Sequence, residues 1–280
     1  MQLVMWLIVG LILGPSLLGI AMPAFFKPLS SIAGAIFLAL AGWELRFLDI
    51  KENKTFYAKV FLGTFVFPFV ISYFLFAQNY FIGLALAISA LPITIQILKE
   101  KGLYETNLAR KTITLASLVD ICAWAGMAFL IPSSDVGSWL LSHWVVLTFF
   151  AGIILGYFFN TARKLQTGSL QKWFLAPLFF AALGWQIDLK ASFSLNDFAI
   201  LFLVAIFVKL VGTYWAARWS GANHRDALNL ASLLNARGAM EIIAANFAFN
   251  AGLINSSTLS SLVLIGITTS FIAVILVKKS

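Results

Sequence analysis

Apolar runs of about twenty residues follow one another along almost the whole chain. A helix needs roughly 20 apolar residues to cross the hydrocarbon core of a bilayer, where no water can satisfy an exposed backbone. The linkers between the runs are too short to form a separate soluble domain. The sequence therefore predicts an all-α membrane protein of about ten transmembrane helices, at approximately 3–20, 29–46, 57–77, 81–98, 108–131, 142–160, 171–187, 197–217, 227–249 and 258–277.

Composition agrees with a membrane location. Charged residues make up 11% of the chain, whereas a soluble domain carries about a quarter. The single cysteine, Cys122, excludes an intrachain disulfide. No spacing of His or Cys residues is typical of a metal site and no nucleophile stands near a base, so we expect no enzyme and no cofactor. The first residues lack a basic region and a small-residue cleavage site, and we expect a retained first span.

Basic residues indicate the orientation of the spans. A net charge of +8 would suit nucleic acid in a soluble protein, but in a multi-pass protein basic residues collect in cytoplasmic loops. When successive linkers are assigned to alternate sides, one side holds only Lys27 and Lys190, and most of the 19 basic residues fall on the other. We therefore expect a multi-pass protein of the cytoplasmic membrane with both termini in the cytoplasm, surrounded by lipid and without a nucleic-acid partner.

The chain also repeats itself. Two short segments return at one common offset of 142 residues, GLILG (10–14) as GIILG (152–156) and ALAGWEL (39–45) as AALGWQI (181–187). Each half then contains five spans, and because five is odd the second half enters the membrane from the opposite side. Such inverted repeats are typical of secondary transporters. We expect a first repeat over 1–140 and a second over 141–280, within one integral membrane domain.

The fourth span of each half is expected to be interrupted. Pro92 lacks a backbone donor and disfavours helix at the residue before it. By itself this would indicate a simple kink, but the corresponding span of the second half has a polar centre, made by Asn235, Arg237, Gly238 and Glu241. Broken helices in inverted repeats meet at the midplane and form the substrate site. The sequence therefore predicts an interrupted helix in the fourth span of each half.

Four ionisable residues lie deep within spans, namely Asp120, Lys209, Arg237 and Glu241. Asp, Lys or Arg costs about 2.5–3.5 kcal/mol at mid-bilayer on insertion scales, so these side chains should face the bundle interior. Arg237 and Glu241 are four positions apart and are expected to form a structural pair on one helix face. Asp120 has Ser117 as its polar neighbour one turn earlier. Lys209 is isolated in its span, which suggests a tertiary contact with Asp120, either functional or purely structural.

A functional role for Asp120 follows from competition. One carboxylate can hold a proton or a hard cation, but not both at once. Alternate exposure to the two sides would then couple proton flow to cation counterflow. Oxygen ligands suit an alkali ion, and we expect Asp120, Ser117 and Thr94 to bind the cation or proton. Lys209 would be the charge partner, released when the external ion binds, and no metal other than the transported alkali cation is expected.

Several of these segments resemble the monovalent cation:proton antiporter superfamily, especially the branch with plant cation/proton exchangers and bacterial potassium-efflux proteins. The matching stretches run in family order and cover well over a third of the chain. They are GLILGPSLLG (10–19), ALAGWELRFLDI (39–50), AISALPITIQILKEKGLYETNLARKTITLASLVDICAW (87–124), PLFFAALGWQIDL (177–189) and LLNARGAMEIIAANFAFNAGLINSSTLSSLVLIGITTSF (233–271).

The resemblance implies two crossing broken helices, an essential aspartate at Asp120, elevator-like motion of a core against a scaffold, and a homodimer. It also places Lys209 where the family commonly has a basic residue. Two departures stand out. Val119 occupies the position before the aspartate, where the family usually has Asn, Asp or Gln, so a cation would lose one polar ligand. The chain also looks like a compact five-plus-five version of a family whose members typically have twelve or thirteen spans.

Three functions remain open from the sequence alone. The leading one is a secondary active transporter that exchanges Na⁺ or K⁺ for protons. Bile-acid sodium symporters share the ten-span architecture, and Arg237 would suit an organic anion, whereas Asp120 suits a cation. A membrane component that keeps the fold without transport is the third, and Val119 is its best support.

Overall fold

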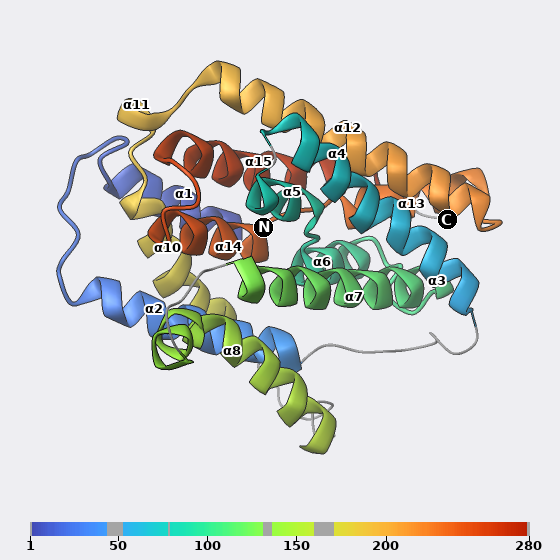
Figure 1. Ribbon diagram of the computed structural model, residues 1–280, viewed down its shortest axis with the longest axis horizontal. Helices are drawn as coiled ribbons and strands as arrows, with labels where there is room; N and C mark the ends of the chain where they lie inside the picture. Colours follow the sequence, from blue (N-terminus) through green and yellow to red (C-terminus); the bar gives the residue numbers. More distant parts are fainter. Residues whose placement is uncertain (1, 44–52, 78, 131–135, 160–170, 279–280) are drawn as a thin grey trace. The chain divides into compact units, whose positions relative to one another are not determined.

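The computed structural model describes residues 2–43, 53–77, 79–130, 136–159 and 171–278, and all regular structure in them is helical. Two compact units are formed from alternating parts of the chain, unit 1 from residues 1–45 and 131–193 and unit 2 from residues 46–130 and 194–280. Figure 1 shows the helices of both units, coloured by their position along the chain. Unit 2 contains all four of the predicted intramembrane charges.

Unit 1 is built from two pairs of packed helices and their connections. α1 packs on α10 and α2 packs on α8, while α10 also contacts α2. Its elements are α1 (Gln2–Leu13), α2 (Phe26–Trp43), α8 (Val136–Phe159), the π-helical turn η3 (Gln171–Leu175), α10 (Ala176–Gln186) and α11 (Leu189–Ser192).

Unit 2 surrounds two interrupted helices with longer continuous ones. α3, η1 and α4 follow one another as a single rod, which lies along α12 (Figure 1). The elements are α3 (Lys54–Phe61), the π-helical turn η1 (Leu62–Val66), α4 (Phe67–Leu75), α5 (Tyr80–Ala87), α6 (Leu91–Glu100), α7 (Asn107–Leu130), α12 (Leu195–Trp219), α13 (His224–Leu234), α14 (Ala239–Asn250) and α15 (Ser256–Leu276).

Five helical stretches among the described residues are long and apolar enough to cross a membrane, and three more are apolar but shorter. Within the described residues, each predicted span coincides with one helix or with consecutive helices, and residues 44–46, 131 and 160 of three predicted spans lie outside the described residues. The first is shorter than expected, because α1 ends at Leu13 and does not continue to residue 20. Pro15 accounts for this end, since proline cannot continue a helix and disfavours helical geometry at Gly14 before it.

Asparagine side chains define the beginnings of three helices in unit 2. Asn79 Oδ1 accepts from the backbone N–H of Phe81 at the beginning of α5, at 3.0 Å. Asn223 caps α13 at 2.7 Å and Asn255 caps α15 at 2.8 Å in the same way. Each cap satisfies a backbone donor that has no partner within its helix. Local sequence therefore fixes where these spans begin.

Close helix contacts in unit 1 occur at glycines, and they are matched across the two halves of the chain. A Cβ on Gly10 would lie 2.0 Å from the carbonyl oxygen of Ala181, and a Cβ on Gly152 would lie 2.0 Å from that of Ala39. The offset of 142 residues relates Gly10 to Gly152 and Ala39 to Ala181. Each half thus contributes the glycine to one contact and the alanine to the other, as expected if a repeat packs against its own copy.

Candidate functional site

Two of the predicted spans are interrupted in unit 2. The first break is the non-helical segment 88–90 between α5 and α6, and Pro92 lies in the first turn of α6. The second is 235–238 between α13 and α14, with Gly238 directly before α14. A Cβ on Gly238 would lie 2.1 Å from the Cδ1 of Ile93, so this glycine lets the two broken spans approach closely.

The two breaks are joined by hydrogen bonds. The backbone N–H of Ala90 donates to the carbonyl of Ala236 at 3.0 Å. Ser89 Oγ donates to the carbonyl of Leu234 at 2.9 Å. Backbone groups released by the interruption of one helix thus find partners in the other, as buried irregular backbone at membrane depth requires. The two interrupted spans therefore meet at their breaks.

Arg237 and Glu241 form a fully buried ion pair at 2.9 Å. Arg237 lies within the break and Glu241 in the first turn of α14, so the pair bridges the break and does not lie on one continuous helix face. The guanidinium also donates to the carbonyls of Ala85 at 3.0 Å, Ala205 at 3.3 Å and Leu86. These contacts tie the second break to the last turn of α5 and to α12.

Lys209 reaches the first break from α12. Its fully buried ammonium donates to the carbonyls of Ala87 and Ile88, at 2.5 Å for Ile88, and to Ser89 Oγ at 2.9 Å. The expected direct contact with Asp120 is not made. Among the described residues, the acidic and basic side chains within ion-pair distance of each other are those of Arg237 and Glu241. Unpaired carbonyls at the end of α5 carry partial negative charge, which accounts for the position of the ammonium.

Asp120 lies in the middle of α7 and is fully buried. Neither carboxylate oxygen accepts a hydrogen bond of normal geometry from the described residues. Two groups interact with it electrostatically, the backbone N–H of Leu91 and the ammonium of Lys209. Leu91 is the first residue of α6, where free N–H groups carry partial positive charge. The carboxylate thus faces the positive end of a half-helix and a nearby ammonium.

The other two predicted ligands, Ser117 and Thr94, lie on helices that pack around Asp120, and so does Asn235, which was predicted as a residue of the second break. α6, α7 and α13 contact one another. Ser117 Oγ, one turn before Asp120, and Asn235 Oδ1, at the end of α13, are both buried and have no partner among the described residues. Thr94 Oγ1 instead donates to the carbonyl of Leu233 at 3.0 Å. Ser117 and Asn235 keep polar atoms available, whereas the Thr94 hydroxyl helps to hold the crossing together.

The chemistry of this region is that of oxygen atoms and fixed charges. Among the described residues, no three His, Cys, Asp or Glu side chains are grouped as a metal site would need. A carboxylate, hydroxyl and amide oxygen with free lone pairs suit a proton or a weakly bound hard cation. Val119, directly before Asp120, is fully buried, and its apolar side chain contributes no polar atom at this position.

Backbone atoms make contacts that sequence reasoning did not find. The carbonyls of Ala85, Ala87 and Ile88 accept hydrogen bonds from the buried side chains of Lys209 and Arg237. Their side chains are apolar and carry no signal for this role. Ser89 is the exception, because the sequence already indicates its hydroxyl, three positions before Pro92, as a polar group at the break.

The chain matches the protein-family model described as "Sodium/hydrogen exchanger, transmembrane". The two matches overlap and cover residues 2–173 and 136–279. The Na(+)/H(+) antiporter NhaS4 of Synechocystis sp. is 27% identical over 365 residues, covering 98% of this chain and 89% of that protein. That alignment is longer than the 280-residue chain, so the relative has positions without a counterpart here.

Two further proteins are similar over most of the chain. The probable Na(+)/H(+) antiporter GerT of Bacillus cereus is 24% identical, covering 92% of this chain and 87% of that protein. The structure of the sodium proton antiporter MjNhaP1 from Methanocaldococcus jannaschii is similar with a TM-score of 0.62 at 16% identity, covering 98% of this chain and 89% of that one. At this identity the structural likeness shows a shared fold.

Proposed function

The chain belongs to the family of transmembrane sodium/hydrogen exchangers, and from this we propose that it exchanges a monovalent cation, Na⁺ or K⁺, for protons across the cytoplasmic membrane. It is a multi-pass membrane protein. The names of its relatives are those of Na(+)/H(+) antiporters. Family membership also favours cation exchange over the symport of organic anions. The Arg237 guanidinium, which an anion would need, is already bound to Glu241 and to backbone carbonyls.

The observation that carries this proposal is the Asp120 carboxylate, buried in α7 without a hydrogen bond of normal geometry from the described residues. A buried polar group without a partner is costly, and a buried charge costs more. Binding of a proton removes the charge, and binding of a cation compensates it. Either ligand therefore stabilises the site, and each excludes the other from it.

Coupling follows from the cost of the unloaded site. An ionised Asp120 with neither ligand is a buried charge without a direct ion-pair partner, because Lys209 acts on it only from beyond ion-pair distance. This cost opposes any movement that seals the site from water. A site loaded with a proton or a cation lacks that penalty. Alternate access then carries protons in one direction and cations in the other, with little slippage of the unloaded carrier.

Lys209 is the charge partner in this mechanism. Its ammonium donates hydrogen bonds to carbonyl oxygens at the first break. An alkali ion binds oxygens of the same type. It acts on Asp120 at longer range than an ion pair. A cation that binds at Asp120 would repel this ammonium and weaken its hold on the break, so ion binding and the geometry of the crossing are linked.

Alternate access is proposed to arise from two inverted repeats, residues 1–140 and 141–280, with the termini in the cytoplasm. The glycine contacts of unit 1 support the repeat. Gly10 meets Ala181, and the residues 142 positions away from each, Gly152 and Ala39, meet in the same way. The mixed origin of units 1 and 2 supports an elevator-like division into scaffold and core. A homodimer is the proposed assembly.

Val119 supports a second candidate, a membrane component without transport activity. It is buried and apolar beside the carboxylate, so a cation at Asp120 has one polar ligand fewer than the resemblance implies. Ser117 and Asn235, with their unpartnered oxygens, supply alternatives for that ligand. We therefore favour transport.

The test is antiport in reconstituted vesicles. The protein is inserted in vesicles with a lumenal pH dye, a pH gradient is imposed, and Na⁺ or K⁺ is added. The wild-type protein is expected to dissipate the gradient, and Asp120→Asn is expected to abolish this. Asp197→Asn is a matched control, because Asp197 is an exposed carboxylate outside the site that accepts from Ser257.

An unchanged response in the Asp120 variant would refute the role of this residue. Uptake of an organic anion without proton exchange would favour symport, and no response to any solute would favour the inactive component.

A further inference from the structure

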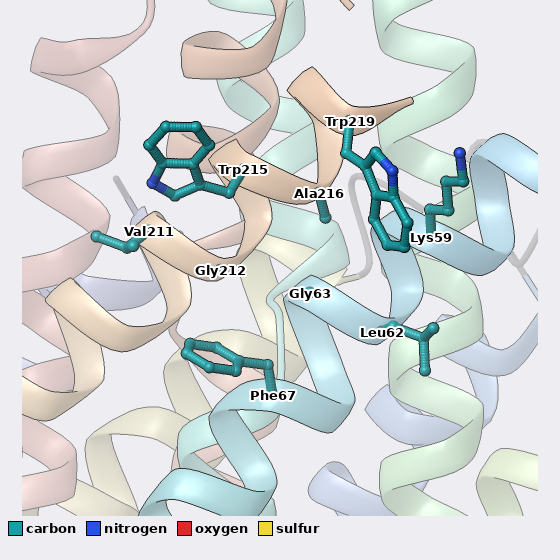
Figure 2. Close-up of a pocket in the computed structure, with 9 residues that line it drawn as sticks. All are labelled: Lys59, Leu62, Gly63, Phe67, Val211, Gly212, Trp215, Ala216 and Trp219. Atoms are coloured by element: carbon teal, nitrogen blue, oxygen red, sulfur yellow. The ribbon is translucent and has the colours of Figure 1, made fainter. Parts of the chain in front are cut away.

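An open groove lies on the surface of unit 2 between the α3–η1–α4 rod and α12, with a volume of about 450 Å³ (Figure 2). Gly63 and Gly212 bring the two elements together, since a Cβ on either would lie within 2.5 Å of the other's carbonyl oxygen. The groove lies beside this close contact between the rod and α12. Its walls are Lys59, Leu62, Phe67, Val211, Trp215 and Trp219.

The two ends of the groove differ in polarity. Lys59 and Trp219 lie at one end, where the ammonium is 4.6 Å from the centre of the Trp219 ring. Phe67 and Val211 lie toward the other end. Lys59 and Phe67 are eight residues apart on one helical rod, a distance of roughly 12 Å along its axis. The groove therefore runs from a cation to a purely apolar end.

The polar end lies at the boundary of the apolar helices. The candidate spans Lys54–Leu75 and Leu195–Trp219 begin close to Lys59 and end at Trp219. Trp and Lys side chains are typical of the membrane–water interface, where a phospholipid places its phosphate. Lys59 forms no ion pair within the described part of the chain, so its charge is available to a ligand.

We propose that this groove binds an anionic phospholipid, with the phosphate at Lys59 and one acyl chain between Phe67 and Trp215. The charge at one end complements the headgroup, and the apolar walls complement the chain. The site is independent of Asp120.

Lipid binding is measured by native mass spectrometry of the detergent-purified protein, titrated separately with phosphatidylglycerol and phosphatidylcholine. Lys59→Gln is expected to weaken phosphatidylglycerol binding about fivefold, the effect of removing one basic residue from an anionic lipid surface, and to leave phosphatidylcholine unchanged. Leu62→Trp should weaken both, because Leu62 is half exposed at the groove wall and a larger side chain there would obstruct the acyl chain.

Two further variants separate a specific site from general attraction. Lys54→Gln removes an exposed charge from the same helix outside the groove and should behave as wild type. Lys59→Arg should retain binding, which would show that the loss in Lys59→Gln is not a folding defect. Equal losses in Lys54→Gln and Lys59→Gln, or none in Lys59→Gln, would overturn the proposal. So would a dimer that Leu62→Trp dissociates without any change in lipid binding.

Discussion

Substitution of Gly10 and Gly152, the glycines related by the internal repeat, should lower the stability of the protein by equal amounts. In Gly10→Ala the new Cβ would lie 2.0 Å from a backbone oxygen of α10, whereas ordinary contact begins at 3.4 Å, so the two helices must separate by roughly 1.4 Å. Overpacking costs about 1–3 kcal/mol, and a backbone neighbour cannot rotate away, so we expect about 3 kcal/mol here. Alanine recovers about 1 kcal/mol in helix propensity. The net cost is therefore about 2 kcal/mol.

The matching substitution Gly152→Ala should cost the same, because its Cβ meets Ala39 at the same 2.0 Å. Thermal unfolding in detergent should show both variants about 4–8 °C below wild type. Gly126→Ala is the control, since its nearest neighbours are Leu84 methyl groups at 3.3 Å, which can move. It should be as stable as wild type or slightly more so. Wild-type stability for Gly10→Ala, or a loss in one glycine variant without the other, would refute the reasoning.

The remaining predictions concern the site. Lys209→Met should lower stability by about 3–6 kcal/mol, measured by thermal unfolding, because two carbonyls and a hydroxyl lose a charged donor. Ser117→Ala should raise the KM for the cation about tenfold in vesicles without loss of stability, since its oxygen has no described protein partner. Val119→Asn should lower that KM by adding an amide oxygen beside Asp120. The KM of the wild-type protein should rise by up to about tenfold for each unit that pH falls, because the ligand must be deprotonated.

The spans and their interruptions could be predicted because their causes are local. Hydrophobic length defines each span, and Pro92 and Gly238 mark the two breaks. The first span was predicted too long, because hydropathy continues beyond Leu13 although Pro15 ends the helix. The glycine repeats were visible in the sequence, but only the structure shows which backbone each glycine contacts.

The arrangement of the charges was harder to predict because it depends on the backbone. The sequence suggested that Lys209 contacts Asp120, whereas its ammonium binds the carbonyls of Ala87 and Ile88. Every residue has a carbonyl, so no pattern of side chains distinguishes these two. Arg237 and Glu241 pair as their spacing predicted, but across the second break, and Arg237 takes its further carbonyl partners from α5 and α12.

Proton release on cation binding tests the role of Asp120 most directly. NaCl or KCl is added to the purified protein in weakly buffered solution, with choline chloride as the control for ionic strength. Competition for one carboxylate predicts that the wild-type protein releases up to about one proton per cation bound, and that Asp120→Asn releases none. Cation binding without proton release, or equal release from the folded Asp120→Asn variant, would contradict the account.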